Sequence, residues 1–288
     1  MNYKDITVII VTYKSKKVIF NCLKSIKNIK NIIIVDNSND SLLKKKVLSK
    51  FPNVNYILSL KNLGYGAGNN LALKKLKTKY ALILNPDTIL IKKCEFKLLM
   101  LAKFLRNNFA IIAPSLFNKK INYGMFSKKK YNFFEKKNNF LKVDYVKGFA
   151  MLLNLKKIRK INFFDENFFL YMEEIDLCKR LRNLGENIFV STEAKVKHLG
   201  AKSSNLGFDL EINRNWHWMW SKVYYSSKHH GFLKTRFVIL PLLFKLFFKY
   251  LLYVFFFNRA KLAISNSRLR GCASAFLNFG SSYRIKKL

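Results

Sequence analysis

The stretch YALILNPDT, residues 80–88, decides the fold. Its first five residues are uncharged and mostly apolar, and the next four form a turn that contains a proline and an acid. Because the apolar residues do not alternate with polar ones, the pattern is typical of a strand buried on both faces of a sheet. Ligands of such sheets bind outside the carboxyl ends of the strands. Asp87, just past this end, is therefore a candidate functional residue.

Similar strand-like runs recur along the chain, and helix-like stretches separate them. Segments 15–28, 40–50 and 68–79 carry apolar residues at spacings typical of helices, and a further helix is expected near 92–107. The alternation predicts an α/β fold with a doubly wound, mostly parallel sheet. The other strand-like runs are ITVIIVTY (6–13), NIIIV (31–35), NVNYIL (53–58), AIIAP (110–114) and DYVKGFAMLLN (144–154).

The character of the sequence changes near residue 210, where we place a domain boundary. Residues 1–210 carry the strand and helix pattern, with a variable insertion at 117–142 that is rich in Lys, Asn and Phe. Residues 211–288 are aromatic and basic, and they contain the apolar run FVILPLLFKLFFKYLLYVFFF (237–257). We expect this second part to be a helical appendage that associates with a membrane.

The apolar run is long enough to span a bilayer, which needs about 20 apolar residues. Lys245 and Lys249 share one face of the expected helix, and Pro241 interrupts its start. A lysine in the middle of a membrane costs about 2.5–3.5 kcal/mol on insertion scales. These features favour an amphipathic helix in the membrane interface, followed by a basic segment on anionic lipid. A single span is the alternative.

Composition and charge narrow the class of protein. At 50% hydrophobic residues the chain has enough apolar material for a core, which excludes a disordered protein. The formal net charge of +38 attracts anions, but no nucleic-acid-binding motif accompanies it, which argues against nucleic acid as a partner. The N-terminus lacks the features of a signal peptide, so we do not expect export. The scattered cysteines favour buried free thiols, and they are Cys22, Cys94, Cys178 and Cys272.

The residues that follow the other strands add candidates. Thr12 and Tyr13 end the first strand-like run, and Asp36 follows the second. Asp36 could accept hydrogen bonds from a nucleobase or ribose, or could hold a turn or cap a helix. The glycine loop NLGYGAGNN (62–70) suits either an anion at a helix N-terminus or a plain tight turn. Asp87 suits Mg²⁺ or Mn²⁺, which take oxygen ligands together with phosphates, or could cap its loop.

Acids cluster in FFLYMEEIDLCKR (168–180), in a chain with 54 Lys and Arg but only 16 Asp and Glu. On a helix, Glu173 and Glu174 would project about 100° apart and could not share one role. Asp176 and Arg180 have the spacing of a helical ion pair. The aromatic run before the acids would raise a carboxyl pKa. A carboxylate of that kind could take a proton from a hydroxyl nucleophile.

Eight segments of the chain form a set with a fixed order and spacing. They are VTYKS (11–15), VDNS (35–38), NLGYGAGNN (62–70), LNPDT (84–88), VKGFAMLL (146–153), FFDENFFLYMEEIDLCKR (163–180), KHLGAKSS (197–204) and SSYR (281–284). This set resembles family 2 glycosyltransferases, and more narrowly the rhamnosyltransferase-like branch that builds bacterial surface polysaccharides. The resemblance covers the chain from about residue 6 to residue 230, and more weakly to the end. It implies a GT-A fold, a nucleotide-sugar donor, a divalent cation (Mg²⁺ or Mn²⁺) and transfer with inversion.

The resemblance also implies roles for single residues. Asp36 would contact the base of the donor nucleotide. Asp87 stands in the place of the last residue of the family's D-x-D metal motif, and Asn85 replaces its first Asp, which predicts a modest affinity for the cation. His198 matches a histidine near the metal or diphosphate, with a structural role as the alternative. The donor-binding residues would be Thr12, Tyr13, Asp36, Asn62, Gly64, Gly66, Asn69, Asn85 and Asp87, and the metal ligands Asp87 and His198.

The family's pair of catalytic acids falls on Glu173 and Glu174, with the base on the second. In this chain the second acid is Glu instead of Asp, which makes it one methylene longer. We expect Glu174 to be the base, and Glu173 and Asp176 stay as alternatives.

The predicted function is an inverting glycosyltransferase that moves a sugar, with rhamnose favoured, from a nucleotide-sugar donor. The acceptor would be a lipid-linked saccharide or a polysaccharide in cell-envelope glycan synthesis, such as O-antigen or lipopolysaccharide. We expect a peripheral protein on the anionic surface of the cytoplasmic face of the inner membrane. The alternatives are a non-catalytic basic binding protein with a degenerate transferase fold, and a glycolipid synthase with another sugar donor.

Overall fold

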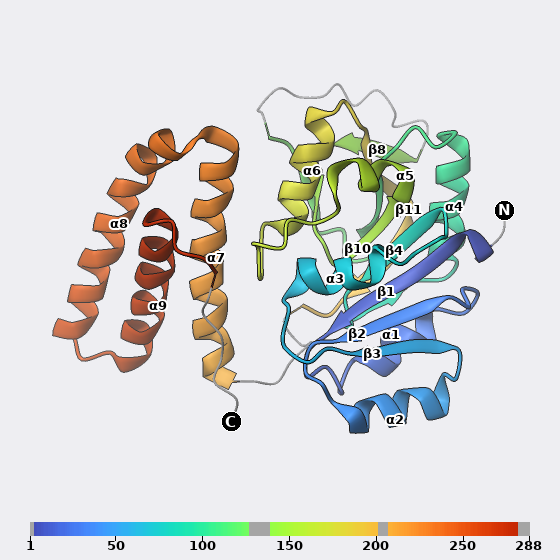
Figure 1. The fold of residues 1–288 in the computed structure, drawn as a ribbon, viewed down its shortest axis with the longest axis horizontal. Helices are drawn as coiled ribbons and strands as arrows, with labels where there is room; N and C mark the ends of the chain where they lie inside the picture. The colour runs from blue at the N-terminus through green and yellow to red at the C-terminus, as the bar shows by residue number, and fades with distance from the viewer. Residues whose placement is uncertain (1–2, 127–138, 201–206, 282–288) are drawn as a thin grey trace. The chain divides into compact units, whose positions relative to one another are not determined.

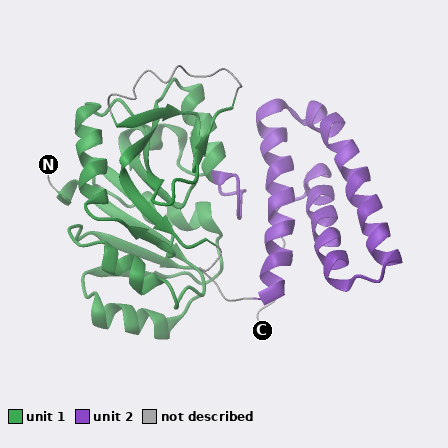
Figure 2. Cartoon of the chain, turned by 180° about the vertical axis from the view of Figure 1, so that it is seen from behind, with its two compact units in different colours: residues 1–165, 174–205 green, residues 166–173, 206–288 purple. Residues whose placement is uncertain are grey.

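The structure is a computed structural model that describes residues 3–126, 139–200 and 207–281 (Figure 1). Part of the expected insertion, the end of KHLGAKSS, most of SSYR and the basic tail lie outside the described residues. The chain divides into two compact units (Figure 2). The first unit comprises residues 1–165 and 174–205, and the second comprises residues 166–173 and 206–288.

A nine-stranded sheet forms the centre of the first unit, in the order β3-β2-β1-β4-β10-β6-β11-β5, with β8 paired to β11. The strands β3, β2, β1 and β4 are parallel. Beyond β4 the sheet is mixed, because β10 runs antiparallel to both of its neighbours. The strands are β1 (Ile6–Thr12), β2 (Ile32–Asp36), β3 (Val54–Leu58), β4 (Tyr80–Leu84), β5 (Thr88–Leu90), β6 (Ile111–Leu116), β8 (Phe140–Val143), β10 (Ala150–Asn154) and β11 (Ile188–His198), and a separate pair joins β7 (Tyr123–Gly124) to β9 (Tyr145–Val146).

Helices cover both faces of this sheet. Because side chains alternate along a strand, Val8 and Ile10 of β1 lie in one hydrophobic core with α1, α2 and α4, and Ile9 lies in the other with α3, α5 and α6. The doubly wound α/β class predicted from the sequence is confirmed. The helices are α1 (Ile19–Ser25), α2 (Ser41–Lys50), α3 (Tyr65–Leu73), α4 (Cys94–Phe104), α5 (Leu155–Ile158) and α6 (Glu173–Asn183), with short 3₁₀ helices η1 (Tyr3–Asp5) and η3 (Arg159–Ile161).

Several elements are shorter than the sequence pattern suggests. The expected strand over 144–154 is divided into β9 and β10 by the residues 147–149, which we call the 147–149 loop. The helix α6 begins at Glu173, because Tyr171 and Met172 have φ angles of +70° and +68°, which a right-handed helix excludes. The four cysteines, all within the described ranges, are buried and unpaired, as expected.

The described part of the second unit contains the helices α7 (Gly207–His230), α8 (Phe232–Phe255) and α9 (Arg259–Phe276). Trp216 and Trp220 lie in their shared core, whereas Trp218 is 46% exposed. Gly271 lets α9 approach α7 closely, because a Cβ at this position would lie 2.3 Å from the carbonyl oxygen of Trp216. These three helices form a core separate from the two cores of the first unit.

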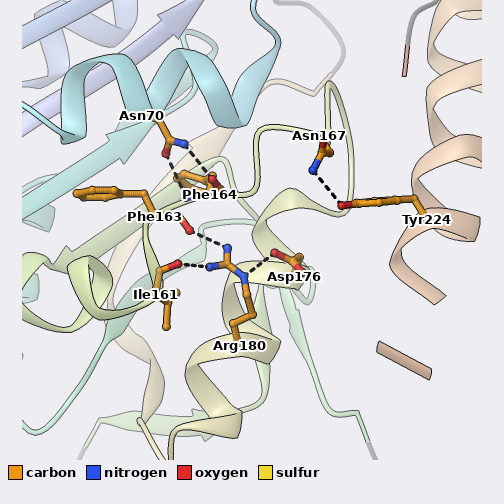
Figure 3. A network of polar contacts seen from close by, with 8 residues as sticks. All are labelled: Asn70, Ile161, Phe163, Phe164, Asn167, Asp176, Arg180 and Tyr224. Atoms are coloured by element: carbon orange, nitrogen blue, oxygen red, sulfur yellow. Dashed lines mark hydrogen bonds and ion pairs between the residues drawn. The ribbon is translucent and has the colours of Figure 1, made fainter. Parts of the chain in front are cut away.

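The segment 166–173 packs against α7 inside the second unit. Asn167 Nδ2 donates a hydrogen bond to Tyr224 Oη (3.1 Å; Figure 3), and Ser221 Oγ donates one to the carbonyl of Leu170 (2.8 Å). The aromatic run before the acids therefore serves as a packing surface for α7. Its ring contacts, with distances between centroids, are Phe168 with Tyr224 (4.8 Å), Phe169 with His217 (4.5 Å) and Tyr171 with Trp218 (5.5 Å).

Candidate active site

The ends of the parallel strands bring predicted donor-binding residues to one edge of the sheet. Thr12, the last residue of β1, pairs in register with Asp36, the last residue of β2. Tyr13 follows Thr12 in the next turn, and Asp87 follows the end of β4. Thr12 is 1% exposed, and its Oγ1 has no hydrogen-bond partner among the described residues. This edge therefore holds a polar atom that a ligand could satisfy.

Asp36 is fully buried and holds the turn after β2 together. Its Oδ1 accepts hydrogen bonds from the backbone N–H and the hydroxyl of Ser38, at 2.8 and 2.5 Å. Its Oδ2 accepts from Tyr56 Oη at 2.8 Å and from the backbone N–H of Asp40 at 3.2 Å. The cap of α2 is Asp40, which accepts a hydrogen bond from the Leu43 N–H at 2.8 Å. Burial, together with the charge of Asp36, raises the pKa of Tyr56, so its hydroxyl stays a donor.

The glycine loop follows β3 and runs into α3. Gly64 has a φ of +82°, which favours glycine, and its N–H donates to Asn62 Oδ1 at 3.1 Å. The Gly64 carbonyl accepts a hydrogen bond from Asn37 Nδ2 at 2.9 Å, so the loop is tied to the residue after Asp36. A Cβ on Gly68 would lie 2.9 Å from a side-chain carbon of β1. This glycine therefore lets α3 pack closely on the sheet.

Asn69 lies on α3 directly after these glycines and is completely buried. Its Nδ2 donates a hydrogen bond to the Tyr65 carbonyl at 2.9 Å. Its Oδ1 has no hydrogen-bond partner within the described ranges. Gly66, one turn earlier, is also buried. Asn69 thus adds a second unsatisfied oxygen to the candidate site.

Asp87 and His198 come together through the pairing of two strands that are far apart in sequence. The strand β5 starts at Thr88 and runs antiparallel to the end of β11, with His198 opposite Thr88. His198 Nε2 lies 3.3 Å from Asp87 Oδ1. This contact lacks the geometry of a hydrogen bond, so Asp87 Oδ1, in a residue that is 2% exposed, has no hydrogen-bond partner in the described part of the chain.

This pair of side chains fits a divalent cation that is shared with a ligand. Carboxylate oxygen and imidazole nitrogen are both ligands of transition metals, and Asp87 Oδ1 is a buried oxygen that a cation would satisfy. Within the residues described, no group of three or more His, Cys, Asp or Glu side chains could hold a metal. The remaining ligands would therefore come from phosphate oxygens and water.

Glu174 lies against the 147–149 loop. A Cβ on Gly148 would lie 3.3 Å from the Cβ of Glu174, so a glycine here permits the close approach. Burial raises the pKa of Glu174 above its ordinary value, while backbone hydrogen bonds, including one from Gly148, and the charge of Lys147 oppose the shift. Its Oε2 is buried and lacks a hydrogen-bond partner among residues that the structure describes. Glu173, the preceding residue, is 4% exposed and belongs to the second unit.

Asp176, two residues after Glu174 on α6, is engaged in an ion pair. It is completely buried, and its Oδ2 accepts a hydrogen bond from Arg180 Nε at 2.7 Å. The same guanidinium donates to the carbonyls of Ile161 at 2.6 Å and Phe163 at 2.7 Å (Figure 3). The ion pair with Asp176 therefore orients Arg180, and Arg180 in turn stabilises the segment between η3 and α6 through the two carbonyls.

Two residues with central positions were not singled out from the sequence. The Tyr65 hydroxyl donates a hydrogen bond to the Gly148 carbonyl. The Phe149 carbonyl accepts hydrogen bonds from the Asn85 N–H at 2.9 Å and the Thr88 hydroxyl at 3.2 Å. The Phe149 ring also stacks on His198, with 4.4 Å between centroids. For the 147–149 loop, the only signal in the sequence is its place in the segment VKGFAMLL.

Comparison with known proteins adds evidence on the family. The model for Glycosyl transferase family 2 matches residues 7–166, which is more than half of the chain. The low-salt glycan biosynthesis hexosyltransferase Agl10 of Haloferax volcanii is 30% identical over 199 residues, which cover 64% of this chain and 64% of that protein. The rhamnosyltransferase WbbL of Escherichia coli K12 is 30% identical over 177 residues, which cover 53% of this chain and 67% of that protein. The chain thus spans about two thirds of the length of each relative.

A solved structure shows the same fold. The mannosyltransferase PcManGT from Pyrobaculum calidifontis, in complex with GDP-Man and Mn²⁺, superposes with a TM-score of 0.57. The match covers 94% of this chain and 86% of that chain, at 10% sequence identity. At this identity the likeness supports a GT-A-like fold and nothing finer.

Replacing Arg180 by Met is expected to destabilise the chain, because the buried carboxylate of Asp176 would lose its cation. Removing one partner of a buried ion pair costs about 3–5 kcal/mol. Urea unfolding followed by circular dichroism should show a loss of that order. The control is Lys157→Met, whose partner Glu186 is more exposed (10% against 0% for Asp176). Equal losses for the two variants would contradict the expectation.

Proposed function

The chain belongs to glycosyl transferase family 2, and we propose that it transfers a sugar from a nucleotide-sugar donor to a hydroxyl of its acceptor, with inversion at the anomeric carbon. The observation that carries this proposal is a set of buried oxygens that lack hydrogen-bond partners among the described residues. Burying such atoms is costly unless a ligand or an ordered water satisfies them. They are Thr12 Oγ1, Asn69 Oδ1, Asp87 Oδ1 and Glu174 Oε2.

The turn after β2 and the glycine loop would bind the donor nucleotide. Asp36 would accept a hydrogen bond from the base, and the Ser38 hydroxyl would yield its place because it can rotate away. Gly64 and Gly66 would let the backbone approach the donor. The remaining donor-binding side chains would be Thr12, Tyr13, Asn62, Asn69 and Asn85.

Asp87 and His198 would hold a divalent cation against the diphosphate of the donor. The bound cation would offset the charge that develops on the departing nucleoside diphosphate. The Mn²⁺ in the PcManGT complex supports this choice of ion. The described part of the chain contributes a buried carboxylate oxygen without a hydrogen bond and an imidazole nitrogen 3.3 Å away from it.

Glu174 would act as the general base toward the acceptor hydroxyl. It takes the hydroxyl proton while the acceptor oxygen forms a bond to the anomeric carbon. The bond from that carbon to the diphosphate oxygen breaks, and the nucleoside diphosphate leaves with the electron pair. A pKa raised by burial suits a base that works near neutral pH. The ion pair of Asp176 with Arg180 favours Glu174 over Asp176 for this role.

We favour rhamnose as the transferred sugar and a lipid-linked saccharide or polysaccharide of the cell envelope, such as O-antigen, as the acceptor. The rhamnosyltransferase WbbL supports the sugar, and the glycan biosynthesis enzyme Agl10 supports the class of product. The identity of the sugar and the identity of the nucleotide are separate questions, and a panel of donors that varies both answers them.

The helix α8 would dock the chain on an anionic membrane surface. Among the described helices it is the one long and apolar enough to cross a membrane, and only 11% of its apolar window is buried. At about 100° per residue, four exposed phenylalanines fall within about 40° of one another. The lysines lie about 60–120° to one side of this stripe. The phenylalanine stripe is Phe237, Phe244, Phe248 and Phe255, and the exposed lysines are Lys234, Lys245 and Lys249.

The packing of α8 favours a helix in the interface over a helix that spans the membrane. Ile239 and Leu246, which lie on the face of α8 opposite the phenylalanine stripe, are buried in the core shared with α7 and α9. The neighbouring helix α9 carries Arg259, Lys261 and Arg268, whose charges oppose insertion beside α8. A helix with one face on protein and one apolar face next to lysines suits the surface of anionic lipid at the cytoplasmic face of the inner membrane.

The donor site is tested by thermal stabilisation with UDP-, GDP- and dTDP-sugars, including dTDP-rhamnose, with and without Mn²⁺. A donor at 100 times its Kd should stabilise the chain by about 2.7 kcal/mol, or about 5–10 °C in Tm. In Asp87→Asn the stabilisation by donor should no longer depend on Mn²⁺, because a cation ligand is lost.

The matched control is Asp5→Asn, at an exposed acid in η1, which should behave like the unaltered chain. If no donor in the panel stabilised the unaltered chain, the transferase proposal would be contradicted, and the degenerate binding protein would replace it.

Membrane docking is tested by sedimentation with vesicles of phosphatidylcholine alone or mixed equally with phosphatidylglycerol. We expect binding to the mixed vesicles, and a loss of at least about tenfold in Phe237→Ser/Phe244→Ser/Phe248→Ser, because each buried phenylalanine contributes about 1.5–3 kcal/mol. Phe117→Ser, at a 63% exposed phenylalanine of the first unit, is the control. Unchanged binding of the triple variant would exclude the stripe as the docking surface.

A further inference from the structure

Tyr65 occupies the junction between the glycine loop and the 147–149 loop. It is the first residue of α3, directly after Gly64, and its own carbonyl accepts the hydrogen bond from Asn69. Its hydroxyl donates to the carbonyl of Gly148. Its ring meets Phe164 edge-on, with 6.0 Å between centroids, which fixes the direction of the side chain. One end of Tyr65 is thus part of the proposed donor site, and the other end holds a different loop.

Gly148 is in turn in contact with Glu174. A Cβ on Gly148 would lie 3.2 Å from Tyr65 Oη and 3.3 Å from Glu174 Cβ, so the tyrosine hydroxyl and the acid crowd the same glycine. The backbone N–H of Gly148 hydrogen-bonds the Glu174 carboxylate. A shift of Tyr65 would therefore be transmitted to Glu174 across a single residue.

We propose that Tyr65 is a positioning residue that links the glycine loop to Glu174 through Gly148, so that binding of the donor sets the orientation of the base. The inference rests on the proposed function and goes beyond it, because it makes the orientation of the base depend on the conformation of the glycine loop. It also gives a role to the hydroxyl of Tyr65, which donates its hydrogen bond to the Gly148 carbonyl.

Other titratable groups lie near Glu174 and must be kept constant in a test. The charge of Lys147, from the 147–149 loop, acts on Glu174, and the charge of Glu174 acts on Cys178, one turn further on α6. Glu173 directly precedes Glu174 on α6. The pKa of the Cys178 thiol is raised to about 12 by burial, so this group stays neutral over the range in which Glu174 titrates. The substitution Tyr65→Phe changes none of these groups and keeps the ring contact with Phe164.

The test is the titration of Glu174 in the full chain, followed by ¹³C NMR of labelled glutamate carboxyls, with the signal assigned through Glu174→Gln. Tyr65→Phe removes the hydrogen bond that holds the Gly148 carbonyl, so Gly148 is free to move and its N–H no longer stays on the Glu174 carboxylate, where it lowers the pKa of Glu174. In Tyr65→Phe we therefore expect this pKa to rise by about one unit. The acidic limb of transfer should move to higher pH in step, since the base must be deprotonated, while stabilisation by the donor stays within about twofold in Kd.

Two further variants sharpen the result. Gly148→Ala, which pushes on both Tyr65 and Glu174, should shift the acidic limb as well. Tyr56→Phe, which removes a hydroxyl from Asp36, should weaken donor binding and leave the limb in place. An unchanged pKa of Glu174 in Tyr65→Phe would overturn the inference alone. A shifted pKa in a chain that transfers no sugar would contradict the proposed function and leave the link between Tyr65 and Glu174 standing.

Discussion

The candidate site depends on the three residues 147–149, which separate β9 from β10. Phe149 fixes the turn after β4 through its carbonyl, and its ring stacks on His198. The Gly148 carbonyl accepts a hydrogen bond from the Tyr65 hydroxyl, and Gly148 lies against Glu174. One short loop therefore holds the turn that carries Asp87, the ring of His198, the glycine loop and the proposed base in a common frame. Such a frame is needed because transfer requires the donor and the acceptor hydroxyl to meet in one geometry.

Much of the sheet edge that we propose for donor binding could be predicted from the sequence, because parallel strands end at a common edge. Continuous apolar runs located β1, β2 and β4; Thr12 and Asp36 end the first two of these strands, and Asp87 follows the third. The second half of the site could not be predicted in this way. His198 reaches Asp87 only through the antiparallel pairing of β5 with β11, which joins segments about 110 residues apart and leaves no periodic signal.

The acidic cluster shows how one motif can serve several purposes. The sequence placed five aromatic and apolar residues ahead of Glu173 and predicted a raised carboxyl pKa. The pKa of Glu174 is raised by burial, yet the rings of that run pack on α7 in the second unit. Asp176 proved to be half of a buried ion pair, as its spacing from Arg180 had suggested. The scarce acids thus include one structural anchor and one candidate base on the same helix.

The measurement that tests the account most directly compares donor binding with sugar transfer in Glu174→Gln, with Glu174→Asp as its partner variant. Glutamine keeps the size of the side chain but cannot accept the proton, so transfer should fall by about 10²–10⁴-fold. Stabilisation by the donor should stay unchanged in Glu174→Gln. Glu174→Asp should keep part of the rate, because it retains a carboxylate and is the acid that the resemblance places at this position. Transfer by Glu174→Gln at the rate of the unaltered chain would contradict the assignment of the base and with it the central role of the 147–149 loop.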